Sequence, residues 1–221
     1  MSAMLAGPAL AAALAKGINM DHLFDPYRDP VKRPWEPADK ERMAGRIREQ
    51  EFAQVAKLGF THIRLNLGQV FLQESTGPRA MREEGLALLD RALDLAAAHK
   101  LALILDLHQI PVPRYADPGE YAALRALWRT LAKRYASRDQ AILFELLNEP
   151  RIEDAARWRE IVRELIADIR AEDPNRWIVV TGAEWGGAEN LIKMGNLKLP
   201  NLVYTYHWYD PFVFTHQGAT W

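Results

Sequence analysis

The sequence predicts an α/β fold of the (β/α)8 TIM-barrel type, incomplete, with about six of the eight βα units present. Short apolar runs alternate with longer amphipathic segments six times from residue 16 onward, which indicates a parallel sheet with helices outside it. A doubly wound sheet fits this alternation too. However, no G-x-G-x-x-G or phosphate-binding loop follows the first apolar run, which weakens that alternative.

Polar side chains inside the apolar runs favour the barrel. Several runs carry polar groups two or four residues apart, so that both lie on one face of a strand. These are Arg64 with Asn66, Asp106 with His108, and Glu145 with Glu149. Such groups suit the polar upper layer of a barrel interior, and they fit poorly on a sheet that is buried against helices on both faces.

Turn residues and helix caps divide the chain into successive elements. We expect strands over residues 17–20, 61–67, 101–107, 141–149, 176–181 and 202–207. The fourth should stop at Glu149, because Pro150 has no N–H and biases the preceding residue away from helix. We expect helices over residues 39–58, 82–99, 118–135, 153–172 and 188–194, with Asp39 and Asp117 as caps and Gly59 ending the first.

Composition narrows the kinds of partner and cofactor that we expect for this protein. A net charge of −1 leaves no electrostatic footprint for nucleic acid or an anionic membrane. Cysteine is absent and no metal-binding spacing such as H-E-x-x-H occurs, so we expect neither a metal nor another cofactor. The apolar opening, residues 1–15, resembles the end of a signal peptide without its basic start, which predicts a secreted or periplasmic protein. One partial barrel domain would then occupy residues 16–221.

The stretch A-I-L-F-E-L-L-N-E-P at 141–150 carries the strongest functional signal. A carboxylate at the C-terminal tip of a buried strand is costly to place there without a purpose. In a barrel of parallel strands, that tip is where catalytic groups lie. We therefore interpret Glu149 as a catalytic acid, with Asn148 beside it.

Five motifs in order resemble those of glycoside hydrolase family 5, the cellulase and endoglucanase group of retaining barrel hydrolases. They are G-I-N-M at 17–20, H-I-R-L-N at 62–66, L-D-L-H-Q at 105–109, F-E-L-L-N-E-P at 144–150 and Y-T-Y-H-W-Y at 204–209. The resemblance implies hydrolysis of a β-linked polysaccharide or oligosaccharide. It implies that Glu149 is the general acid/base, that Asn148 holds the substrate 2-hydroxyl, and that Arg64 orients the nucleophile carboxylate.

Further substrate contacts are expected at the other strand ends. By the same resemblance, His108 is a subsite residue, while His207 and Tyr209 flank the catalytic carboxylates. Trp185 follows the fifth expected strand on the substrate face, so we expect it to stack on a sugar ring.

The resemblance places the nucleophile glutamate at the end of a seventh strand, and the sequence stops at Trp221 before such a strand. Glu145 lies about 13 Å from Glu149 along a strand at ~3.3 Å per residue, too far for a retaining pair. We therefore expect a C-terminally truncated hydrolase whose open barrel edges favour self-association. A mannanase or exo-glucanase of the same superfamily, and an inactive carbohydrate-binding fragment, stay open as alternatives.

Overall fold

The computed structural model describes residues 7–24, 35–74, 80–108, 118–138 and 141–219. Six strands in these ranges form one parallel sheet in sequence order, so β1 and β6 are its edges. They are β1 (Gly17–Phe24), β2 (His62–Leu67), β3 (Ala102–Leu107), β4 (Ile142–Glu145), β5 (Trp177–Thr181) and β6 (Leu202–Thr205). This is the partial barrel that the sequence predicts.

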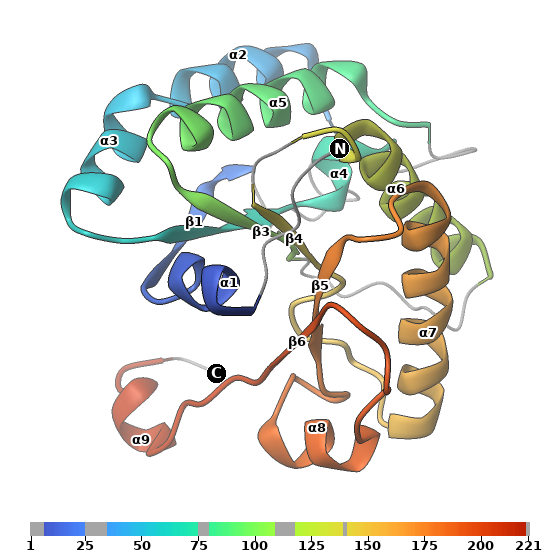
Figure 1. Ribbon diagram of the computed structural model, residues 1–221. Helices are drawn as coiled ribbons and strands as arrows, with labels where there is room; N and C mark the ends of the chain where they lie inside the picture. Colours follow the sequence, from blue (N-terminus) through green and yellow to red (C-terminus); the bar gives the residue numbers. More distant parts are fainter. Residues whose placement is uncertain (1–6, 25–34, 75–79, 109–117, 139–140, 220–221) are drawn as a thin grey trace.

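Helices cover the outside of the sheet, as Figure 1 shows. The larger ones are α2 (Pro37–Arg46), α3 (Glu49–Lys57), α5 (Glu83–Ala98), α6 (Pro118–Tyr135) and α7 (Ala155–Glu172). The shorter ones are α1 (Gly7–Ala13), α4 (Gln69–Leu72), α8 (Ala188–Met194) and α9 (Phe212–Thr215). The predicted boundaries of α6 and α8 are confirmed, while Asp117, the expected cap of α6, lies outside the described residues. No helix in the described ranges is both long and apolar enough to cross a membrane.

The two faces of the sheet differ in chemistry. Outward-facing residues pack under the helices in one large core that includes Ile63, Leu65, Leu103, Leu105 and Phe144. The inward face has an apolar layer of Ile104, Leu143 and Val179. Asp106 and Glu145 lie two residues beyond Ile104 and Leu143 on the same strands, and Asn66 of β2 is in register with them. The polar layer therefore lies toward the carboxyl ends of the strands, where a barrel carries its site.

Two buried tryptophans tie helices to the ends of strands near this polar layer. Trp128 of α6 donates its indole N–H to the carbonyl of Leu146 at 3.2 Å. Trp158 of α7 donates to the carbonyl of Thr181 at 2.9 Å. Both rings are fully buried, so each bond satisfies a polar atom inside the core and fixes the strand end against its helix.

The fourth strand ends earlier than predicted. β4 stops at Glu145, and Glu149 lies in the loop that follows, so the expectation of a strand reaching Glu149 is wrong. Beyond Glu145 the backbone keeps bonds from Leu146 N–H to Val179 and from Asn148 N–H to Leu107. Leu146 and Leu147 are buried like all four residues of β4, so the chain stays inside the fold after the regular strand pairing ends at Glu145.

The segment after β1 also departs from expectation. The single helix predicted over residues 39–58 is two helices, α2 and α3, because Ile47 leaves the helical conformation and is buried in the core. Asp39 is not the N-cap: Glu36 caps α2, and Asp39 closes a capping box with it. Gly59 ends α3 with a φ of 77°, as predicted. β1 continues to Phe24, beyond its predicted end.

The expected leader contains a docked helix. Leu10 of α1 is buried against Ile104, Leu143 and Val179, the apolar layer of the inward face. α1 therefore covers the floor of the partial barrel. The division into a leader over residues 1–15 and a domain over residues 16–221 stays a prediction.

Candidate active site

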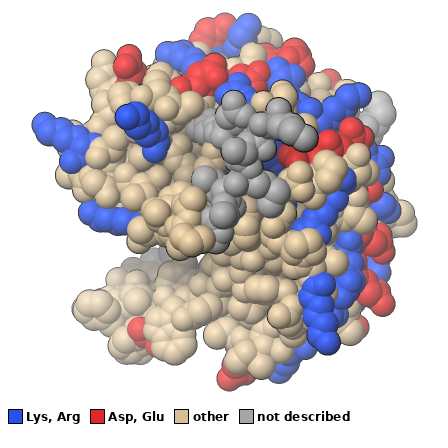
Figure 2. Space-filling view, viewed as in Figure 1, with Lys and Arg blue, Asp and Glu red and all other residues tan. Residues whose placement is uncertain are grey.

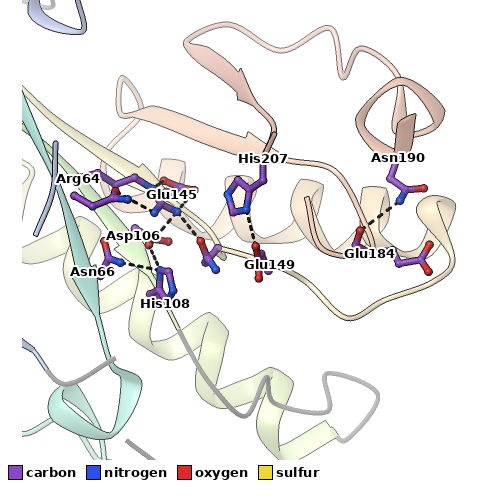
Figure 3. A network of polar contacts seen from close by, with 11 residues as sticks. Arg64, Asn66, Asp106, His108, Glu145, Glu149, Glu184, Asn190 and His207 are labelled. Carbon is purple, nitrogen blue, oxygen red and sulfur yellow. Dashed lines mark hydrogen bonds and ion pairs between the residues drawn. The ribbon is translucent and has the colours of Figure 1, made fainter. Parts of the chain in front are cut away.

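The predicted site residues lie in two neighbouring groups at the carboxyl ends of the strands (Figure 3). One group is held by the strands themselves and surrounds Arg64 of β2; we call it the strand-held group. The other is carried by the loops after β4, β5 and β6 and contains Glu149 and His207; we call it the loop-held group.

Arg64 is saturated with acceptors. Its Nε and Nη2 donate to the two carboxylate oxygens of Glu145 at 2.7 and 2.8 Å, a bidentate pairing. Nη2 also lies 2.8 Å from Oδ1 of Asn148 and 3.0 Å from Oδ2 of Asp106. Nη1 donates to Oδ1 of Asn19 at 3.4 Å. The guanidinium is thus fixed in orientation by neighbours on β1, β3 and the β4 end.

The charges of the strand-held group shift one another's titration. Burial opposes the charged form of Arg64, but its hydrogen bonds to Glu145 and the charge of Asp106 outweigh this and raise its pKa. Burial and the nearby charge of Asp106 raise the pKa of Glu145 above its usual range, although Arg64 acts in the opposite direction. A buried cation between two carboxyl groups is the physical core of the site.

Glu149 belongs to the loop-held group. Its Oε1 lies 2.7 Å from Nδ1 of His207. The His207 N–H donates to the carbonyl of Gly186 at 2.9 Å, which ties the end of β6 to the loop after β5. The Glu149 side chain is about one-quarter exposed, at 23%, so its carboxyl group can meet a ligand while keeping the His207 contact.

The loop after β5 has an unusual backbone. Glu184, Trp185 and Gly186 have consecutive positive φ values of 44°, 67° and 71°. Such conformations are costly for residues other than glycine and persist where the surroundings impose them. Here the N–H groups of Glu184 and Trp185 donate to the carbonyls of Ile152 and Pro150, so this loop is bound to the one that carries Glu149.

Trp185 is the exposed aromatic of that loop. Its side chain is half-exposed, and the guanidinium of Arg151 lies over the indole, 4.2 Å from the ring centroid. Tyr209 lies beside His207, with the two ring centroids 6.4 Å apart in an edge-to-face arrangement. Tyr209 is also about half-exposed. Aromatic faces of this kind suit the apolar faces of sugar rings.

His108 joins the strand-held group. Its Nδ1 lies 2.7 Å from Oδ2 of Asp106 and 3.0 Å from Nδ2 of Asn66. The structure therefore brings Arg64, Asn148, His108, Glu149 and His207 into adjoining networks, with Tyr209 and Trp185 at the edges. No group of three or more metal-ligating side chains occurs in the part of the chain that the structure describes.

Two site members carry more of the geometry than the sequence analysis assigned to them. From the sequence, Glu145 was considered as a partner of Glu149 and was set aside because of its distance along the strand. It instead reaches Arg64, which also contacts Asn148. The sequence held a signal for this cluster: Asn66, Asp106 and Glu145 each lie on the inward face of a strand. They lie side by side once the strands are paired in register.

Comparison with known proteins identifies the family. The model of the cellulase family, glycosyl hydrolase family 5, matches residues 34–221. Endoglucanase C of Acetivibrio thermocellus is 32% identical over 191 residues, which are 82% of this chain and 56% of that protein. Cellodextrinase A of Ruminococcus flavefaciens is 32% identical over 196 residues, 82% of this chain and 57% of that protein.

Solved structures agree with this match. Endoglucanase Cel5A of Thermotoga maritima has a TM-score of 0.78 and 28% identity, over 95% of this chain and 65% of that one. The chain spans little more than half the length of the curated relatives it matches. By its sequence and by its six parallel strands, the chain belongs to glycosyl hydrolase family 5, the cellulase family of barrel glycosyl hydrolases.

Proposed function

We propose that the chain carries the acid/base half of a retaining endo-β-glycosidase of the endo-β-1,4-glucanase type, acting on β-glucan. The observation that carries the proposal is the Glu149 carboxyl group, held 2.7 Å from His207 and preceded by Asn148, which Arg64 holds in turn. In the proposed reaction, Glu149 protonates the leaving glycosidic oxygen and later activates the water that releases the sugar.

The nucleophile is proposed to be a glutamate outside these 221 residues. A retaining pair requires two carboxyl groups about 5–5.5 Å apart. Among the described carboxyl groups near Glu149, Glu145 has both oxygens bonded to Arg64, and the Asp106 side chain is fully buried. Glu184 lies on the far side of Glu149 from Arg64 (Figure 3). Each of these fits a structural role better than attack on a sugar.

Substrate contacts follow from the positions of the other polar and aromatic side chains. Asn148 is proposed to hold the 2-hydroxyl, with His108 and Tyr209 contacting neighbouring hydroxyls. Trp185 presents a half-exposed indole on which a sugar ring can stack. The polymeric nature of the proposed substrate supports a secreted or periplasmic location. Self-association through β1 and β6 is a further proposal, because both are edges of the described sheet.

A mannan substrate is a second candidate. The Thermotoga maritima Cel5A structures include complexes with cellobiose and with mannotriose, at 28% and 26% identity to this chain. The strand-end residues discussed above do not distinguish the two sugars. Parallel binding measurements with cello- and manno-oligosaccharides would rank them.

Calorimetry with cellotetraose and an assay on carboxymethyl-cellulose test the proposal. We expect the 221-residue chain to bind cellotetraose, and Asn148→Ala to weaken binding while Asn175→Ala, remote from the site, leaves it unchanged. We expect no turnover. Turnover that Glu149→Gln abolishes would support the enzyme and overturn an external nucleophile. Absence of both binding and turnover would contradict the proposed function, and binding that Asn148→Ala does not alter would contradict this site.

The genomic sequence after the codon for Trp221 tests the source of the nucleophile. We expect the reading frame to continue into a strand that ends in glutamate. In the extended enzyme, Glu149→Gln should lower turnover of carboxymethyl-cellulose by about 10²–10⁴-fold, the usual contribution of a general acid. An aryl β-glycoside with an activated leaving group needs little protonation, so its glycosylation step should lose much less.

A further inference from the structure

The ring nitrogen Nδ1 of His108 has two neighbours, one that requires it to be a hydrogen-bond donor and one that requires it to be an acceptor. Oδ2 of Asp106, at 2.7 Å, is an acceptor when the carboxyl group is ionised. Nδ2 of Asn66, at 3.0 Å, is a donor only. A ring nitrogen carries either a proton or a lone pair, so it can satisfy one of these neighbours and not both.

The carboxylate is the stronger partner. A hydrogen bond to an ionised acceptor is shorter and roughly twice as strong as one between neutral groups. The Asp106 side chain is fully buried, where a carboxylate needs every hydrogen bond that its surroundings can donate. A proton on Nδ1 of His108 that is donated to Asp106 is therefore the favoured arrangement.

The side-chain amide of Asn66 becomes compatible with a proton on Nδ1 when the amide is turned by about 180°, which exchanges its oxygen and nitrogen positions. Oδ1 of Asn66 is buried with no hydrogen-bond partner among the described residues. Turning the amide brings this oxygen beside the Nδ1–H and moves the NH₂ group away from it. The rotation breaks no hydrogen bond of Oδ1 among the described residues, and it places the NH₂ group where Oδ1 has no partner. Asn66 and Asp106 then both accept from the same ring N–H.

Asp106 also connects His108 to Arg64. The same Oδ2 that accepts from His108 lies 3.0 Å from Nη2 of Arg64. Glu145 contacts Arg64 from β4, and no contact between Glu145 and His108 is present in the described ranges. One carboxyl group of the pair therefore acts on the histidine and the other on the arginine alone.

We infer that Asp106 is a positioning residue that holds neutral His108 in the tautomer protonated at Nδ1, so that Nε2 is an acceptor for a sugar hydroxyl. This inference rests on the proposed function for its use of a sugar. Asp106 itself does not touch the substrate. It fixes the ring plane, the proton position and the distance from the Arg64 cluster, and thereby gives the His108 subsite a preference for a hydroxyl donor.

Heteronuclear NMR of the 221-residue chain with isotope-labelled histidine measures the tautomer directly. Six histidines give a tractable spectrum, and His108→Gln assigns the relevant signal. In the unmodified chain, above the pH at which the ring is charged, we expect the proton on Nδ1. A neutral His108 protonated at Nε2 would overturn the inference without any further variant.

Asp106→Asn and Glu145→Gln form a matched pair, since each replaces one carboxyl group of the cluster by its amide. We expect Asp106→Asn to shift the His108 population toward the Nε2–H tautomer and Glu145→Gln to leave it unchanged. Equal effects of the two variants would overturn a specific role for Asp106. A spectrum of dispersed signals in each variant shows that the fold is retained.

Titration with cellobiose tests whether the tautomer of His108 matters for sugar binding, separately from which tautomer is present. We expect cellobiose to move the His108 Nε2 signal, and Asp106→Asn to weaken binding about tenfold, the size of one hydrogen bond. Unchanged affinity despite an altered tautomer would overturn the role in sugar recognition. If the unmodified chain has the Nδ1–H tautomer but no site variant affects sugar binding, the proposed function fails while the tautomer assignment stands.

Discussion

The strand-held and loop-held groups of the site differ in how they are built. Arg64, Asp106 and Glu145 lie on paired strands, are largely buried and satisfy one another through ion pairs. Glu149, His207 and Trp185 lie on loops that are joined mainly by backbone bonds, and the side chains of Glu149 and Trp185 are more exposed than those of the strand-held group. The comparison indicates a division between a rigid electrostatic base and a more adaptable surface that meets the ligand.

The surface of the molecule shows a related contrast. Charged side chains gather over the helices that cover the sheet, while the end of the chain around α9 carries few (Figure 2). Beyond β6, exposed apolar side chains include Trp208, Phe212, Val213 and Phe214. Exposed apolar patches of this kind often mark an interaction surface, so this one supports the proposed self-association through β6.

Removing Arg64 should break the strand-held group. Arg64→Ala leaves the buried carboxyl groups of Glu145 and Asp106 without their cation, so we expect a loss of about 3–5 kcal/mol of unfolding free energy. Urea unfolding measures it. The control is Arg134→Ala, which removes the partly exposed pairs with Asp90 and Glu83 and should cost about 0–1 kcal/mol. Similar losses in both variants would mean that the buried cluster has no special weight.

The next largest loss of unfolding free energy is expected at the floor of the barrel, where α1 packs. Leu10→Ala removes the side chain that α1 buries against Ile104, Leu143 and Val179, and such core truncations cost about 2–5 kcal/mol. We expect a value near the low end, because a terminal helix can also detach. Ala11→Ser, on the exposed side of α1, is the control. An unchanged unfolding midpoint for Leu10→Ala would favour the interpretation of residues 1–15 as a leader.

The loop-held group should respond in binding more than in stability. Trp185→Ala is expected to weaken cellobiose binding about tenfold, or ~1.4 kcal/mol, through loss of the stacking face. Arg151→Ala should cost less, about two- to fivefold, because exposed cation–π contacts contribute ~0.5–1 kcal/mol. Arg157→Ala is the matched control, as its guanidinium lies 5.9 Å from the ring of Tyr121 instead. Equal effects of the two arginine variants would exclude a specific platform at Trp185.

The smallest expected effect is on how the unfolding free energy varies with pH. Burial and Asp106 raise the pKa of Glu145, so the folded state binds its proton more readily than the unfolded state does. This contribution to stability is complete below the ordinary glutamate range and is lost as pH rises through the raised folded pKa. The stability of the unmodified chain relative to Glu145→Gln should therefore fall with rising pH. Urea unfolding across acid and neutral pH measures this difference, and a rise would show that Arg64 dominates the titration.

Local patterns in the sequence predicted most of the elements and the residues at the strand ends. The apolar runs, their punctuation by proline and glycine, and the motifs at 62–66, 105–109 and 144–150 depend on neighbours along the chain. The extent of α6 and α8 was predicted for the same reason. The end of β4 and the break between α2 and α3 were not, because strand pairing at Glu145 and the burial of Ile47 depend on residues far away along the chain.

By itself, the sequence determined the family and the alternation of strands and helices, and it singled out Glu149, Arg64 and His207 as candidate site residues, since these follow from local composition and order. Only the tertiary structure decided that Arg64 joins Glu145 and Asp106 in one cluster, and that Glu149 lies on a loop beside His207. It also decided that α1 packs on the barrel floor. These contacts join residues far apart in the chain, and they depend on strand register and on the free energy of burying charge, neither of which is local.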